Sequence, residues 1–164
     1  KLKMSGKERL DNIAPVIHAV KPREVRSIGS LDDDEEELLD AREVFDYIRD
    51  ITDPEHPYTL EQLNVVQEEL IEVDHSRPSM PVVRIRFTPT IPHCSLAALI
   101  GLMLVIKLQR SLAKNVKIDV KITEGTHNTE HAINRQLADK ERVAAALENT
   151  SLMETVNRCL SPPE

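Results

Sequence analysis

An apolar run over residues 96–106, near the middle of the chain, limits the fold more than any other segment. The run is about half the roughly 20 residues that a membrane span requires, so we expect it inside a folded domain. Because residues 95–113 are apolar on nearly all sides, we predict a central helix that is buried over most of its surface. Gly101 within it costs about 1 kcal/mol relative to alanine, which predicts the close approach of another backbone.

Strand patterns stand on both sides of this helix. Residues 82–88 and 116–122 alternate apolar and charged side chains, which is typical of a sheet with one face in water. Residues 65–73 are predicted as a further strand, joined to the second by a polar turn. A strand, a helix and a strand in succession predict a crossover with the two strands parallel. The expected fold class is therefore α+β, with a small mixed three-stranded sheet packed with helices.

Three more helices are expected. The first begins near Leu38 and is stopped by the two prolines of residues 53–57, since proline lacks a donor and constrains the residue before it. The others are predicted over residues 130–148 and 152–160. Within the longer one, residues 139–142 are interpreted as a solvated helical face.

The first 37 residues differ from the rest in their charge pattern. Basic residues are spread from Lys1 to Arg26, and an acidic run follows at residues 32–37. Such blocks repel themselves and solvate well, so we predict a flexible charged tail over residues 1–37 and one domain over residues 38–164. The tail is either a solubilising extension or an arm in which Ile13, Val16 and Ile17 form a short docking motif.

Composition excludes some functions. A formal charge of -7, two Phe, two Tyr and no Trp provide neither a basic surface for phosphates nor a platform for base stacking, so direct nucleic-acid binding is disfavoured. The sequence predicts no membrane span and no secretory signal. The two cysteines, Cys94 and Cys159, lie far apart and provide no disulfide framework, which favours a reducing compartment.

Cys94 is the first candidate for chemistry. It lies where a predicted strand has ended, two prolines stiffen the connector, and the central helix begins. The positive end of the helix dipole, together with a protonated His93, would favour the thiolate, which is both nucleophile and metal ligand. The alternative is a structural role, because cysteine is often buried as a small hydrophobe.

A second candidate group is His127, Glu130 and His131, after the last predicted strand. Their H-x-x-E-H spacing matches an inverted zinc-peptidase motif, in which both histidines would face one metal from a helix. The competing interpretation is helix capping, with His127 on the preceding loop.

Topology connects the two groups. If the strands that precede them are parallel, both connectors leave the same edge of the sheet. We therefore predict one shallow site containing Cys94 and His127 that can hold a soft divalent metal such as zinc. The further candidate ligands are His93, Glu130 and His131.

Five stretches carry a resemblance to a known family: residues 40–46 (DAREVFD), 51–57 (ITDPEHP), 88–95 (TPTIPHCS), 123–127 (TEGTH) and 136–148 (QLADKERVAAALE). They closely resemble the cytosolic iron-sulfur assembly component 2 family, its B form more than its A form. The likeness covers residues 40–160 and implies the fold of PaaD and SufT-like proteins.

The resemblance also implies a function. Members of this family are regarded as non-enzymatic adaptors in a complex that targets iron-sulfur clusters to cytosolic and nuclear apoproteins. Their partners are a β-propeller adaptor and a HEAT-repeat protein, and their reactive cysteine falls on Cys94. The expected location is the cytoplasm, with access to the nucleus.

One cysteine cannot complete the four-thiolate ligand set of a typical cluster. We therefore expect no permanently bound cofactor, and any iron-sulfur cluster is transient, shared with a partner or held across a homodimer. Two other functions stay open. One is a zinc-dependent hydrolase that uses His127, Glu130 and His131. The other is a thiol redox protein in which Cys94 pairs with Cys159.

Overall fold

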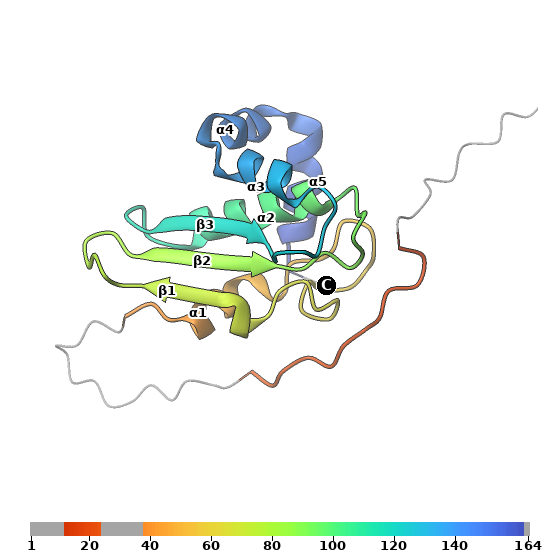
Figure 1. Ribbon diagram of the computed structural model, residues 1–164, viewed down its shortest axis with the longest axis horizontal. Helices are drawn as coiled ribbons and strands as arrows, with labels where there is room; N and C mark the ends of the chain where they lie inside the picture. The colour runs from red at the N-terminus through yellow and green to blue at the C-terminus, as the bar shows by residue number, and fades with distance from the viewer. Residues whose placement is uncertain (1–11, 24–37, 163–164) are drawn as a thin grey trace, which may run out of the picture.

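The computed structural model describes residues 12–23 and 38–162, and its centre is a three-stranded sheet (Figure 1). The strands are β1 (Ile71–Asp74), β2 (Val82–Phe87) and β3 (Lys117–Ile122), in the order β1-β2-β3. β1 is antiparallel to β2, and β2 is parallel to β3. The predicted α+β class, the mixed sheet and the parallel pair are confirmed.

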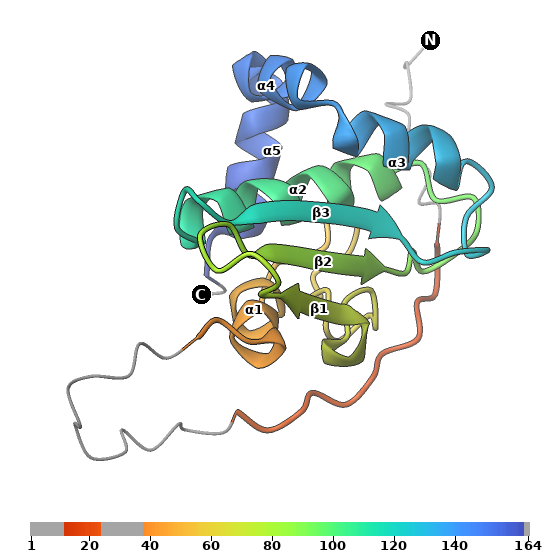
Figure 2. The same ribbon diagram turned by 60° about the vertical axis from the view of Figure 1, so that its left-hand side comes forward.

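The parallel pair is joined by α2 (Ala97–Ser111), the predicted central helix. Val83, Ile85 and Phe87 of β2 point to the helix side and are fully buried, whereas Arg84 and Arg86 alternate with them on the other face. Figures 1 and 2 show α1 (Ala41–Ile48) and α2 on the same side of the sheet. The expectation of one buried and one wet face is therefore confirmed.

Gly101 lies where α2 is closest to its neighbours. A Cβ atom built there would be 2.5 Å from Leu137 Cδ1 and 3.2 Å from Phe87 Cζ. The close approach is thus to two side chains, and the predicted contact with another backbone is wrong.

The strand predicted over residues 65–73 is also wrong in extent. Val65 and Val66 are buried, but the 3-10 helix η1 (Glu68–Leu70) separates them from β1. Asn64, with a φ of 57°, turns the chain just before them. Their apolar character therefore reflects packing into the core, and only residues 71–74 pair with β2.

The helix predicted over residues 130–148 is two helices, α3 (Glu130–Ala138) and α4 (Lys140–Glu148). Asp139 between them has extended backbone angles, and its carboxylate accepts hydrogen bonds from the N–H groups of Glu141 and Arg142 at 3.0 and 3.2 Å. Asp139 is thus an N-cap and not part of a continuous helical face. A last helix, α5 (Thr150–Leu160), follows and is capped by Asn149. None of the helices in the described ranges has the length and apolar character needed to cross a membrane.

Part of the predicted tail, residues 12–23, lies in an extended conformation along the outside of the domain (Figure 2). We call this segment the strap. His18 N–H donates to Gln62 O at 2.7 Å, and Lys21 N–H donates to Glu61 Oε1 at 3.0 Å. The boundary between a flexible tail over residues 1–37 and a domain from residue 38 stays a prediction; residues 12–23 contact the domain through these two bonds, and the rest of residues 1–37 lies outside the described ranges.

Candidate functional site

Two connectors meet at the carboxyl ends of β2 and β3, and together they form the candidate site. Residues 88–96 lead from β2 to α2, and residues 123–129 lead from β3 to α3. Thr123 N–H donates to Phe87 O at 2.8 Å, and Asn128 N–H donates to Pro92 O at 2.9 Å. The predicted meeting of the two connectors at one sheet edge is confirmed.

Cys94 lies inside the first connector, two residues before Leu96, the N-cap of α2. Its side chain is buried, with 5% of the residue exposed. Its carbonyl oxygen accepts from Ala97 N–H at 3.4 Å and lies 2.9 Å from His127 Nε2. Because α2 begins later than predicted, the thiol lies outside the first helical turn, where the helix dipole acts most strongly.

His127 joins the two connectors through Nε2, while Nδ1 fixes the ring within its own connector. Its Nδ1 accepts a hydrogen bond from Thr129 N–H at 3.1 Å. Nδ1 therefore carries no proton in this arrangement, so Nε2 carries it and donates to the carbonyl of Cys94. The side chain positions the Cys94 main chain, and neither ring nitrogen is open to a further ligand without breaking one of these bonds.

Glu130 and His131, the remaining residues of the H-x-x-E-H group, form contacts that differ from those of His127. Glu130 Oε2 accepts from Gly125 N–H at 2.8 Å, where Gly125 adopts a φ of 77°. The side chain of His131 is 87% exposed, with Nε2 3.6 Å from Glu130 Oε1. Since α3 begins at Glu130, His127 is on the preceding loop, and the N-cap residue Thr129 makes no side-chain capping hydrogen bond.

The predicted metal ligands are only partly brought together. Cys94 and His127 are neighbours, whereas His93 and His131 are exposed. Among residues 12–23 and 38–162, no three His, Cys, Asp or Glu side chains are grouped so that they could hold a metal ion. A hydrolytic zinc centre needs three protein ligands and an open position, and the described side chains provide no such set.

Cys159 lies on the buried face of α5, and burial raises the pKa of its thiol. α5 contacts the second half of α2, where Arg110 donates to Asn157 Oδ1 at 3.0 Å. Cys94, in contrast, precedes the first residue of α2. The redox hypothesis gains no support from this arrangement of the two cysteines.

Sequence reasoning missed three polar residues that shape the site. The hydroxyl oxygens of Thr88 and Thr123 are 2.9 Å apart and join the ends of β2 and β3. Asn134 Oδ1, on α3, accepts from Ile122 N–H at 2.8 Å. The only available signal was a threonine directly after each of the two strands.

Residues 41–124, from the start of α1 into the second connector, match the family described as iron-sulfur cluster assembly protein. The chain belongs to this family. Cys94 falls within the matched residues, whereas His127, Glu130 and His131 fall outside them. The family expected from the five stretches is thus confirmed.

Similar members of the family come from several animals. A MIP18 family protein of Caenorhabditis elegans is 59% identical over 160 residues, which is 97% of this chain and 99% of the relative. Cytosolic iron-sulfur assembly component 2B of Mus musculus is 54% identical over 157 residues, which is 96% of this chain and 94% of the relative. The MIP18 family protein galla-2 of Drosophila melanogaster is 52% identical over 152 residues, with 93% and 96% covered.

Proposed function

We propose that this family member is a non-enzymatic adaptor of the cytosolic iron-sulfur targeting complex and that Cys94 is its reactive thiol. The name of the mouse relative, cytosolic iron-sulfur assembly component 2B, supports the pathway. The observation that carries the role of Cys94 is its position in a connector that a second connector fixes through His127. A functional side chain whose backbone is fixed by a neighbouring segment is held in one geometry, as a reactive group requires.

The cargo is an iron-sulfur cluster, which the complex delivers to cytosolic and nuclear apoproteins. A single thiolate provides one ligand of four, so the other ligands must come from a partner, a client or a second copy of this chain. With 5% of the residue exposed, Cys94 can bind a cluster only when the connector opens or a partner reshapes it. The partners that fit this role are a β-propeller adaptor and a HEAT-repeat protein.

Zinc at the same surface is a weaker proposal. A zinc ion would bind the Cys94 thiolate and replace one hydrogen bond of His127. His93, Glu130 or His131 would complete the set of zinc ligands only after movement of the loop. We therefore assign no resident cofactor to the protein.

Replacement of Cys94 by alanine or serine tests the proposal. We expect both variants to lose maturation of client proteins, measured as iron incorporated into clients in cells where the variant replaces the original chain. The proteins should stay folded, with a loss of about 1 kcal/mol in the free energy of unfolding, which is ordinary for one buried substitution. They should still co-purify with the two partners.

Cys159→Ala is the matched control, because Cys159 is the other buried cysteine, with 2% exposed. It should leave client maturation unchanged. Normal maturation with Cys94→Ala, or an equal loss with Cys159→Ala, would remove the special role of Cys94.

A further inference from the structure

A cavity lies at the end of the sheet opposite to the connector that carries Cys94. β1 ends there, β2 and β3 begin there, and the loop of residues 75–81 lies beside that of residues 112–116 (Figures 1 and 2). The cavity has a volume of about 230 Å³ and is lined by seven residues: Asp74, Ser76, Arg77, Met80, Val82, Arg84 and Lys117. Three cations and one carboxylate give this lining an excess of positive charge, whereas the whole chain carries a charge of -7.

The three cations of the lining differ in their contacts. Arg84 donates from Nη1 to Glu72 Oε1 at 3.1 Å and from Nη2 to Asp74 Oδ2 at 3.2 Å, so two carboxylates balance its charge. Arg77 and Lys117 are exposed, and they form no ion pair within the part of the chain that the structure describes. The positive charge that is available to a ligand is therefore that of Arg77 and Lys117.

Asp74 is the carboxylate of the lining, and both of its oxygens already accept hydrogen bonds. Oδ1 accepts from the N–H and the hydroxyl of Ser76, and Oδ2 accepts from Arg84. These bonds, with those from Ser76 as the largest cause, lower the pKa of Asp74 to about 2. The charge of Asp74 is thus engaged within the protein and opposes an anionic ligand less than a free carboxylate would.

Hydrogen bonds between the two loops fix the backbone around the cavity. Asn115 Nδ2 donates to Ser79 O at 3.1 Å. Lys117 N–H donates to Pro81 O at 2.9 Å, which sets the start of β3 beside the start of β2. Because the segments that carry Arg77 and Lys117 are joined in this way, little ordering of the main chain is needed for both side chains to contact one ligand.

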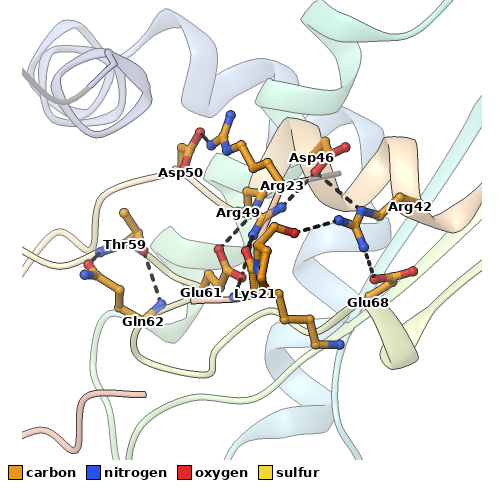
Figure 3. Close-up of polar contacts among 11 residues, drawn as sticks. Lys21, Arg23, Arg42, Asp46, Arg49, Asp50, Thr59, Glu61, Gln62 and Glu68 are labelled. Atoms are coloured by element: carbon orange, nitrogen blue, oxygen red, sulfur yellow. Dashed lines mark hydrogen bonds and ion pairs between the residues drawn. The ribbon is translucent and has the colours of Figure 1, made fainter. Parts of the chain in front are cut away.

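Another cavity, of about 180 Å³, has the opposite balance of charge. Its lining contains the carboxylates Asp46 and Asp50 and one cation, Lys107. Asp46 pairs with Arg49, and Asp50 pairs with Arg23 (Figure 3). The excess of positive charge thus distinguishes the cavity at the end of the sheet.

We propose that the cavity at this end of the sheet binds the phosphate group of a small molecule through Arg77 and Lys117. A guanidinium can donate two parallel hydrogen bonds to two phosphate oxygens, and an ammonium adds a compact charge with three donors. Two free cations match a phosphate dianion better than the single charge of a carboxylate. The proposal does not depend on the function assigned to Cys94.

The size of the cavity limits the ligand. Pockets for drug-sized molecules measure about 300–1,000 Å³, so about 230 Å³ suits a phosphate with a short carbon chain. Met80 and Val82 provide a small apolar wall for that chain. One phosphate requires only this local charge, whereas a nucleic acid would need cations along its whole backbone.

The test titrates the full chain with inorganic phosphate and, separately, with glycerol 3-phosphate. Ionic strength is held constant so that general screening is equal throughout. Calorimetry measures the affinity, and amide chemical shifts locate the bound probe. We expect saturable binding of at least one probe, with shifts confined to residues 74–82 and 117. The probe with the lower Kd identifies the source of the phosphate as a free ion or an ester.

Arg77→Gln and Lys117→Gln should each weaken this binding at least tenfold, because each removes a charge-assisted hydrogen bond. Lys114→Gln is the matched control, since it removes the same charge three residues before Lys117 from an exposed residue outside the lining. It should change the Kd less than twofold. Cys94→Ala should leave the Kd unchanged, so this proposal and the proposed function stand or fail separately.

Three results would overturn the phosphate site. One is the lack of saturable binding of either probe, and another is an equal loss of affinity in the Arg77, Lys117 and Lys114 variants, which would indicate diffuse attraction. The third is acetate that binds as tightly as phosphate, because the ligand class would then be a carboxylate.

Discussion

At the scale of single residues, Asp53 is a buried carboxylate with a structural task. It is 8% exposed and accepts hydrogen bonds from the N–H groups of Glu55 and His56, both at 2.9 Å. Burial raises the pKa of Asp53, although these two hydrogen bonds lower it in part. The carboxylate thereby orients the two residues that hold Asn12 of the strap.

The raised pKa predicts a specific dependence of stability on pH. Above the ordinary value of 3.8, folded Asp53 still binds a proton that the unfolded chain has released, so stability falls as pH rises through the window up to the folded pKa. Asp53→Asn keeps an acceptor oxygen and removes the charge. We expect urea unfolding from pH 4 to pH 7 to show a flatter profile for this variant and no loss of stability at pH 7.

Asp74→Asn is the control, and it should leave the slope between pH 4 and pH 7 unchanged. The pKa of Asp74 is lowered to about 2 by hydrogen bonds from Ser76, with Arg84 contributing, so its contribution is present above 3.8 and is lost toward pH 2. A variant Asp53→Asn that is less stable than the original chain at pH 7 would show that the charge itself is required.

At the residue scale, the sequence predicted the position of Cys94 but not the contacts of Glu55 and His56. The placement of Cys94 between a strand and a helix was readable from the flanking prolines. The role of residues 53–57 was not, because the two prolines predict only a helix stop. That prediction is wrong, since α1 already ends at Ile48, and the clamp made by Glu55 and His56 was missed. A hydrogen bond to the main chain of residue 12 leaves no pattern in the sequence.

At the scale of elements, the parallel pair β2–β3 determines the site. Its existence followed from two alternating patterns on either side of an apolar helix, and the register pairs Phe87 with Ile122 at the ends that face the connectors. The break between α3 and α4 could not be predicted in the same way. Asp139 stands within a helical pattern, and its capping role depends on backbone angles that only the packed chain determines.

The connector clamp makes a prediction for His127. His127→Ala removes the bond to Cys94 O, and a lost hydrogen bond of about 1 kcal/mol should favour opening of the connector about fivefold. We expect Cys94 to be alkylated by iodoacetamide about fivefold faster, measured on the Cys94 peptide by mass spectrometry.

His131→Ala tests the same motif from its exposed end. The side chain of His131 is 87% exposed, so its removal should leave the alkylation rate unchanged. Equal acceleration by both substitutions would favour a shared ligand site over the positioning role of His127.

At the scale of the whole molecule, the strap, which precedes the boundary expected at residue 38, contacts the domain. Its attachment uses main-chain groups, which leave no pattern in the sequence, so the charge pattern of residues 1–37 predicted a tail. The buried pair of Arg49 and Glu61 was equally invisible, since both residues are common on solvated surfaces.

Deletion of residues 1–23 should therefore lower stability. Arg49, which is fully buried, loses the acceptor Lys21 O, and Glu61 loses the N–H of Lys21. Arg49 keeps its bonds to Glu61 and Asp46, so at this ion pair the deletion removes these two hydrogen bonds only. At about 1 kcal/mol for each, we expect a loss of about 2 kcal/mol in urea unfolding.

Lys21→Ala is the control for this deletion, because it keeps both main-chain contacts and removes only an exposed ion pair with Glu69. It should change the free energy of unfolding by less than about 0.5 kcal/mol. A truncated chain as stable as the original would show that solvent replaces the strap without cost.

The strap is also synthesised earlier than the residues that hold it. Asn12 and His56, which holds its carbonyl, are separated by 44 residues. At a synthesis rate of about 5–20 residues per second, His56 is made about 2–9 seconds after Asn12. The strap of a nascent chain is thus made before the surface that anchors it exists. The contacts of its Asn12 with the domain can form only after residues 53–57 have been synthesised.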